Sequence, residues 1–234
     1  MKDQDVLLRL KSLSNPQYKE GMAKFGINTD HALGVSLYVL RPLAKEIGKD
    51  HDLAKELWTS GLHEARILAS MLAEPDKVTE GLMEAWVNDF TSWDIYDQVC
   101  SNLFDGTRFA YNKAVEWSQR NEEFVKRAGF VLMATLSVHD KKADDHTFEQ
   151  FFPHIMREAI DERNFVKKAV NWALRQIGKR TLVLNNKAIE LAQELKKSES
   201  TSSRWIATNA PRELTSDKVQ TRLKKKQWKN GDHA

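Results

Sequence analysis

The stretch Phe124-Val125-Lys126-Arg127-Ala128 returns 41 residues later as Phe165-Val166-Lys167-Lys168-Ala169. A weaker third copy, Ile206-Ala207-Thr208-Asn209-Ala210, follows after another 41 residues. Self-similarity with a period of about 40–47 residues is typical of paired helices of the HEAT or armadillo kind, which stack side by side into a solenoid. The repeat therefore predicts an all-α, HEAT-like helical-repeat solenoid with a long concave surface.

A cation precedes the alanine in the first two copies, Arg127 in one and Lys168 in the next. Stacking of equivalent helices would place these cations in register along the concave surface, so the pattern predicts a basic groove. A groove of this kind favours a polyanion as the partner. Lys141 and Lys142, which we expect in a loop, should matter much less for binding.

The composition agrees with one helical domain over residues 1–234. No Pro-, Gly- or Ser-rich linker divides the chain, and its 5 Pro and 10 Gly favour long helices over sheets. The formal net charge of +3 is a weak argument for nucleic acid, so the distribution of charge matters more. A single cysteine, Cys100, excludes an internal disulfide and a cysteine-based zinc site.

We expect a cytoplasmic protein without membrane segments. No apolar run approaches the length of about 18 residues that a membrane span requires, and no signal-peptide pattern opens the chain. The histidines are scattered and no Gly-rich phosphate loop is present, so we expect neither a metal nor a cofactor.

Helix formers and capping residues predict helices through nearly the whole chain. Asn28-Thr29-Asp30 forms a good N-cap cluster, and Gly48 is placed to end the helix that follows. The first 27 residues are expected to be capping helices, and residues 216–234 a basic tail that is either solubilising or an extra phosphate contact. The main helices are expected at 31–47, 50–59, 61–73, 76–88, 93–104, 106–118, 121–137, 145–159, 162–177 and 181–197, with short ones at 204–212 and 216–227 after a polar break at 198–203.

One candidate site lies at the start of the helix expected from residue 93. Trp93 and Asp97 are one helical turn apart, so an indole and a carboxylate share a face. Asp94 suits the first turn because a carboxylate is favourable near the positive end of a helix. Asp97 lies deeper, where aspartate is a mediocre helix former. The alternative is a surface aspartate paired with a neighbouring arginine.

Two further candidates lie on the repeated helices. Arg127 stands at the edge of an apolar stripe, and the alternative is an arginine lying over the next helix with its head in solvent. Lys168, Trp172 and Arg175 share a face at spacings of four and three, and for Trp172 the alternative is core packing.

Cations, indoles and one carboxylate form an unusual set for a DNA groove. Cations bind phosphates, and indoles offer flat faces to bases or to positive groups. A lone carboxylate repels phosphates, so its presence makes sense if positive charge develops nearby during a reaction. Cleavage of an N-glycosidic bond produces such a charge, because the sugar becomes an oxocarbenium-like cation, as in glycoside hydrolysis.

These motifs resemble the bacterial DNA alkylation repair family, the alkylpurine DNA glycosylases built from HEAT-like repeats. The likeness covers roughly residues 30–195 and is clearest over 85–180. It rests on three stretches in this order: Ser92-Trp93-Asp94-x-x-Asp97, Lys126-Arg127-Ala128, and Phe165-x-x-Lys168-Ala169-x-x-Trp172-x-x-Arg175.

The resemblance implies a role for each matching residue. Asp97 matches the aspartate that stabilises the sugar cation and positions water, and Trp93 and Trp172 match the groove tryptophans that contact the lesion nucleotide. Arg127 matches the arginine that holds the DNA backbone, and we expect Lys126, Lys168 and Arg175 to contribute to DNA binding. The family's Trp-Trp-Asp run is Ser92-Trp93-Asp94 here, so one aromatic is absent, and its N-terminal lesion contacts cannot be placed.

The resemblance predicts a monomeric, metal-independent DNA glycosylase of base excision repair that acts on alkylated double-stranded DNA. The expected substrates are N3- and N7-alkylpurines, whose positive charge already weakens the glycosidic bond. Full base flipping, which other glycosylases use, would then be unnecessary. Two alternatives stay open: a protein-binding HEAT adaptor and a DNA-structure-binding protein of the same superfamily that lacks catalysis.

Overall fold

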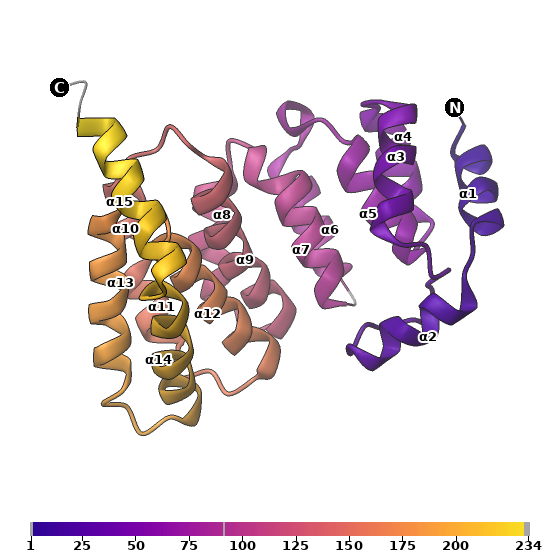
Figure 1. The fold of residues 1–234 in the computed structure, drawn as a ribbon. Helices are drawn as coiled ribbons and strands as arrows, with labels where there is room; N and C mark the ends of the chain where they lie inside the picture. Colours follow the sequence, from indigo (N-terminus) through magenta and orange to yellow (C-terminus); the bar gives the residue numbers. More distant parts are fainter. Residues whose placement is uncertain (1, 91, 232–234) are drawn as a thin grey trace. The chain divides into compact units, whose positions relative to one another are not determined.

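The computed structural model describes residues 2–90 and 92–231, with side chains up to residue 228 (Figure 1). Met1 of the predicted capping element and residues 232–234 of the predicted basic tail lie outside the described residues. All regular secondary structure within these ranges is helical, which confirms the all-α fold class. The chain forms two compact units, residues 1–109 and 110–234, each described by itself below. A single domain over the whole chain stays a prediction.

The first unit consists of seven α-helices and two short 3-10 helices among its described residues. Helix α1 packs against α4 and α5, and α5 packs against α3 and α7. The bounds are α1 Asp3–Ser12, α2 Pro16–Lys24, α3 Leu37–Ile47, α4 His51–Thr59, α5 His63–Leu72, η1 Pro75–Lys77, α6 Glu80–Asn88, α7 Trp93–Asn102 and η2 Phe104–Gly106.

An aromatic cluster holds the first unit together. The rings of Trp58 and Trp86 stack with centroids 3.9 Å apart and nearly parallel planes. The rings of Phe90 and Tyr96 are nearly perpendicular with centroids 4.3 Å apart, and the hydroxyl of Tyr96 donates to the Phe90 carbonyl at 3.0 Å. Because Tyr96 belongs to α7 and is fully buried, this cluster fixes the helix that carries the first candidate site.

The second unit contains α8 to α15. Helix α9 packs closely against both α8 and α12, and α14 packs against α12 and α13 (Figure 1). The bounds are α8 Ala110–Ser118, α9 Glu123–His139, α10 Asp145–Glu149, α11 Phe152–Glu158, α12 Asn164–Gly178, α13 Leu182–Leu195, α14 Thr201–Leu214 and α15 Asp217–Gly231.

The repeated stretches stack in register within this unit. The ring centroids of Phe124 and Phe165 lie 5.8 Å apart. The alanines that end the three stretches, Ala128, Ala169 and Ala210, are all completely buried. Alanine at these positions lets consecutive repeat helices approach closely. The 41-residue period therefore corresponds to a structural repeat, as the sequence predicts.

Gly129 permits a second close approach, between α8 and α9. A Cβ atom at this position would lie 2.4 Å from the backbone nitrogen of Ser118, a distance that no side chain can accept. Glycine is therefore required here for helix packing, although it lowers the intrinsic stability of a helix interior.

The helices expected from residues 76 and 106 begin at Glu80 and Ala110. Three further boundaries differ from the predictions for reasons that the structure shows. The helix expected from residue 31 begins at Leu37, because Gly34 at φ +79° and its neighbours form a loop. The helix expected over 145–159 is divided at residues 150–151, because Pro153 cannot continue a helix and is accommodated in the first turn of α11. The break expected at 198–203 ends at Ser200, whose hydroxyl accepts from the Ser203 amide and caps α14.

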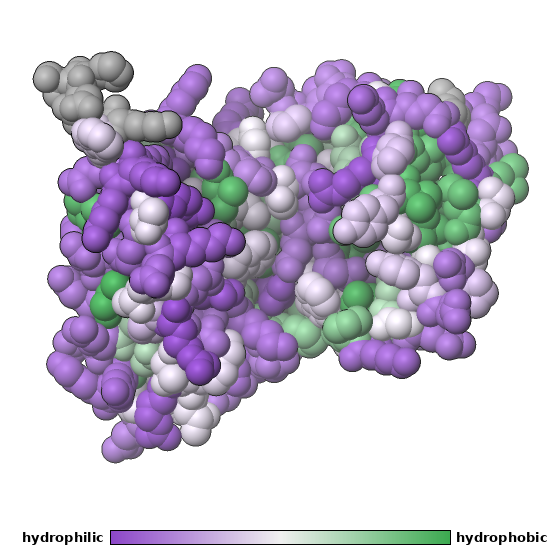
Figure 2. All heavy atoms as spheres, viewed as in Figure 1, coloured by the Kyte–Doolittle hydropathy of each residue, from purple (hydrophilic) through white to green (hydrophobic). Residues whose placement is uncertain are grey.

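The basic tail forms a helix as far as it is described. Val219 and Leu223, four residues apart, are buried where α15 packs against α13 and α14. Lys224 and Lys225 are exposed, and Figure 2 shows hydrophilic residues over the outward side of α15. In the described residues, none of the helices is both long and apolar enough for a transmembrane segment.

Candidate functional site

The start of α7 is fixed by a hydroxyl and a carboxylate. Ser92 is the N-cap residue, but its buried hydroxyl donates to Asp94 Oδ1 at 2.7 Å and does not cap an amide of α7 itself. The same hydroxyl accepts from the backbone amide of Asn28 at 3.3 Å. Ser92 therefore ties the N-terminal segment to the first turn of the helix that carries Trp93 and Asp97.

Asp94 also contacts a buried imidazole. His63 Nε2 lies 2.8 Å from Asp94 Oδ2, and the His63 side chain is 4% exposed. Both carboxylate oxygens of Asp94 are thus held, one by Ser92 and one by His63. The helix-dipole role suggested by the sequence remains compatible with this geometry, but the sequence did not reveal the histidine.

The neighbour of His63 shapes the loop beside it. Glu64 is completely buried, and its carboxylate accepts from the amides of Leu33, Gly34 and Val35 at 2.9, 2.7 and 3.1 Å. A buried carboxylate is tolerated when several donors surround it. The three donors hold the loop in a curve, which is why the predicted helix at residue 31 does not form.

A cavity of about 220 Å³ opens between α2, this loop, α5 and α7 in the first unit. Trp93 and Asp97 both line it, and the indole nitrogen of Trp93 donates to the Phe25 carbonyl at 3.1 Å. The full lining is Tyr18, Met22, Ile27, Val35, Leu37, His63, Ile67, Trp93, Asp94, Asp97 and Gln98.

This cavity combines two carboxylates and an indole with apolar walls. Carboxylates at the edge of an apolar cavity act strongly on a nearby positive charge, because few water molecules screen them. They can also accept hydrogen bonds from a water molecule. The arrangement therefore suits the stabilisation of a cationic centre that water attacks.

Sequence reasoning missed the contributions of His63 and of the N-terminal segment. Tyr18 and Met22 line the cavity from α2, which the sequence had assigned only to end capping. A usable signal was the pair His63-Glu64 at the start of a helix whose side chains are mostly buried. Two ionisable side chains on a buried helix require partners, and here both partners lie at the site.

In the second unit, Arg127 is almost fully buried. It is 5% exposed, and its Nη1 donates to the Phe165 carbonyl at 2.9 Å. The head of this arginine does not lie in solvent, so that alternative is wrong. Arg127 joins two successive repeats, and its role in DNA binding stays a prediction.

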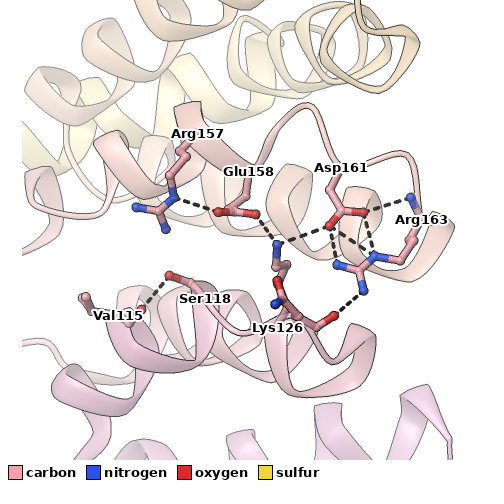
Figure 3. Close-up of polar contacts among 8 residues, drawn as sticks. Val115, Ser118, Lys126, Arg157, Glu158, Asp161 and Arg163 are labelled. Atoms are coloured by element: carbon pink, nitrogen blue, oxygen red, sulfur yellow. Dashed lines mark hydrogen bonds and ion pairs between the residues drawn. The ribbon is translucent and has the colours of Figure 1, made fainter.

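Lys126 lies at the centre of a charge cluster (Figure 3). Its ammonium pairs with Glu158, and with Asp161 at 3.4 Å, and all three side chains are largely buried. Burial opposes the charge on Glu158, but hydrogen bonds from Arg157 and Lys126 outweigh it and lower the pKa of this carboxyl. A phosphate contact by Lys126 would require loss of these pairs, and the role of Lys126 in DNA binding stays a prediction.

The three residues predicted on α12 have different environments. Arg175 Nη1 lies 2.8 Å from Glu213 Oε2, and the other Glu213 oxygen pairs with Lys179. Lys168 is exposed and Trp172 is half-buried. Of the two cations expected on this face, Lys168 is therefore the more accessible to a phosphate group.

The structure thus brings Trp93 and Asp97 together in one cavity, and it places Arg127, Lys168, Trp172 and Arg175 on the stacked helices α9 and α12. The predicted concave basic groove stays a prediction. Among the described residues, no group of three His, Cys, Asp or Glu side chains has the arrangement of a metal site.

Comparison with known proteins gave two matches. A family model described as DNA alkylation repair enzyme matches residues 6–214. A solved structure, described as a new family of proteins related to the HEAT-like repeat DNA glycosylases with affinity for branched DNA structures, aligns with a TM-score of 0.74. The alignment has 22% identity and covers 91% of this chain and 95% of that one, so it shows a shared HEAT-like fold. No curated protein sequence matched.

Proposed function

Since this chain belongs to the DNA alkylation repair enzyme family, we propose that it is a DNA glycosylase that removes cationic N3- and N7-alkylated purines from double-stranded DNA by hydrolysis. The observation that carries the proposal is the cavity of the first unit, where Trp93 stands beside the carboxylates of Asp94 and Asp97. The family supplies the class of chemistry, and this cavity supplies groups that suit it.

The proposed reaction separates a base that already carries positive charge. The bond between C1′ and the purine nitrogen breaks, its electron pair neutralises the base, and the sugar becomes an oxocarbenium-like cation. The Asp97 carboxylate stabilises this cation and accepts a proton as water attacks C1′. The products are a free alkylpurine and an abasic site, and the leaving base needs no general acid.

The indoles add attraction for the cation. Trp93 lines the cavity with Asp97, and the ring face of an indole attracts a positive group by about 0.5–2 kcal/mol. We assign the same role to the half-buried Trp172. A neutral lesion would gain none of this attraction, so charge on the base would select the substrate.

The proposed partner is the phosphate backbone of alkylated duplex DNA. Lys168 is exposed and available for a phosphate, and Arg127 would act from the seam between two repeats. Contacts by Lys126 or Arg175 would each require loss of an existing ion pair. We propose that the protein acts as a cytoplasmic monomer in base excision repair and needs no metal.

The test is release of free base from methylated duplex DNA, separated by chromatography. The purified protein should release 7-methylguanine or 3-methyladenine, and EDTA should not reduce the rate. Uracil, hypoxanthine and 1,N6-ethenoadenine should remain in the DNA. No release of any methylated base would contradict the proposal, and efficient release of a neutral base would contradict selection by charge.

A second function has specific support, namely recognition of DNA structure without catalysis. Ser92 replaces an aromatic residue of the family motif, and its hydroxyl holds Asp94. The structurally similar protein belongs to a family described by its affinity for branched DNA. Tight binding to a four-way junction, together with no release from methylated duplex, would favour this second function over the first.

A further inference from the structure

The C-terminal helix α15 carries two cations that turn toward the body of the second unit. Arg222 and Lys226 are four residues apart and therefore share one face of the helix. Arg222 Nη2 donates to the Lys179 carbonyl at 3.0 Å, and Lys226 Nζ donates to the Arg180 carbonyl at 3.0 Å. Both contacts lie at the end of α12, so α15 places its cations beside a helix C-terminus.

Arg180 joins this end of α12 to the end of α9. Its guanidinium donates to the carbonyls of Ser137 and Asp140 at 3.2 and 2.6 Å and lies 4.1 Å above the Phe148 ring. The side chain is 8% exposed, so its position is fixed by packing and by several hydrogen bonds. Lys141 contributes another cation and donates to the Val138 carbonyl.

These side chains surround a cavity of about 380 Å³. In the part of the chain that the structure describes, five of the residues lining the cavity are cationic and none is acidic. The lining consists of Ser137, Val138, Lys141, Gln176, Lys179, Arg180, Arg222, Leu223 and Lys226. We refer to this cavity as the α15 pocket.

Capping of helix ends does not account for all of this charge. The C-termini of α9 and α12 supply roughly −0.5 each, about −1 together. Glu213 pairs with Lys179, Asp145 acts on Lys226, and Asp140 and Asp144 act on Arg180. None of these carboxylates lines the cavity, so cations are in excess on the surface that faces it.

The environment of Lys226 agrees with this excess. Burial, and then the nearby cations Arg180 and Lys141, lower the pKa of its ammonium below the ordinary value. An anion in the pocket would relieve this repulsion. Arginine and lysine side chains are also the usual donors to phosphate oxygens, with arginine able to form two parallel hydrogen bonds.

We propose that the α15 pocket binds a pair of adjacent phosphate groups through Arg222, Lys226 and Lys141. The phosphates of a nucleic-acid backbone and those of a free oligophosphate share this chemistry, because both present adjacent anionic oxygens to cationic donors. The pocket belongs entirely to the second unit, and its chemistry does not depend on whether the chain cleaves glycosidic bonds.

The test compares two double variants on the same helix. Arg222→Gln/Lys226→Gln removes two cations from the pocket, whereas Lys224→Gln/Lys225→Gln removes two exposed cations that do not line it. Both variants change the net charge equally, so a difference between them reports the pocket. Binding is measured by fluorescence anisotropy with unmodified duplex DNA over a range of salt, and by calorimetry with pyrophosphate.

If the ligand is a nucleic-acid backbone, the pocket variant should bind DNA roughly tenfold more weakly, with a salt slope less steep by about 1.8 for two phosphates. If the ligand is a free oligophosphate, only the pyrophosphate binding should disappear. Equal effects of the two double variants, or no effect of the pocket variant in either measurement, would overturn the proposal.

A second pair of variants tests whether weaker binding comes from the pocket or from altered packing of α15. Lys141→Gln removes a cation of the pocket that lies in the segment after α9 and not on α15. Lys142→Gln is the control, because Lys142 is exposed and does not line the pocket. Lys141→Gln should reduce binding in the same measurement as the α15 variant, by a fewfold, while Lys142→Gln should not. Unchanged melting temperature and helicity are required of every variant.

Discussion

The carboxylates beside the cavity of the first unit have different partners from those that link the stacked helices of the second unit. In the first unit, Asp94 is held by a hydroxyl and an imidazole, and Glu64 by three backbone amides. In the second unit, Glu158 and Glu213 pair with lysines and arginines. Cation pairing cancels charge, whereas amides and hydroxyls fix a carboxylate and leave its negative charge in place. The first unit therefore retains negative charge beside a cavity, and this suits stabilisation of a developing cation.

The largest effect is expected from removal of one carboxylate at that cavity. Asp97→Asn should lower the rate of alkylpurine release by about 10²–10³, as expected for loss of one well-placed electrostatic stabiliser. DNA affinity should hardly change, because the loss of a negative charge cannot weaken phosphate contacts. Single-turnover release assays and anisotropy measure the two quantities separately.

The matched control is Asp76→Asn, which makes the same change at an exposed position of the first unit. It should leave release unchanged. If Asp97→Asn retains full activity, the assignment of the catalytic carboxylate is wrong, and the contrast between the two units has no catalytic meaning.

A smaller effect is expected from the indole of the second unit. Trp172→Leu should reduce release of cationic lesions by roughly 3- to 30-fold, the rate equivalent of one cation–π contact. Trp172→Phe should cost less, because it retains an aromatic face. Melting curves must first show that both variants are folded, since Trp172 is half-buried. A Leu variant as active as the wild type would contradict the role of Trp172 in substrate selection.

Lys168 and Lys126 provide a direct comparison of an exposed cation with a paired one. Lys168→Gln should weaken DNA binding a fewfold and make the salt slope less steep by about 0.9, as for one phosphate contact. Lys126→Gln should leave that slope unchanged, because its charge is already paired with Glu158 and Asp161. The same salt titration measures both, and equal slopes for the two variants would contradict the distinction.

The smallest effect concerns acid stability. Burial opposes ionisation of Glu158 and Asp161, but their ion-pair and hydrogen-bond partners outweigh it, so both pKa values are lower in the folded protein. These groups therefore add stability above about pH 4, near the ordinary carboxyl pKa, and this stability is lost as the pH falls through the lowered values.

Lys126→Gln removes the shared cation, so the pKa of both carboxyls should rise and the loss of stability should begin at higher pH. Urea unfolding midpoints between about pH 3 and pH 7 measure this shift, with Lys142→Gln as an exposed control. Identical acid profiles for the two variants would show that the cluster in Figure 3 does not govern acid stability.

Local signals in the sequence were sufficient for the fold. Helix propensity and the 41-residue period predicted stacked helices, and the buried alanines at 128, 169 and 210 confirm the register. The one-turn spacing of Trp93 and Asp97 also predicted their shared face, and both line the same cavity. These inferences succeed because residues within a few turns interact through the geometry of the helix itself.

The partner of each charged side chain was decided only by the tertiary structure. Glu64 takes its donors from residues about 30 positions earlier, Lys126 pairs with carboxylates about 32 positions later, and Lys141 lines a basic pocket although the sequence suggested an unimportant loop. Ion pairing and burial depend on distances of a few ångström between segments that are remote in sequence. The sequence by itself therefore determined which helices form and repeat, while folding determined which charges are cancelled and which remain available.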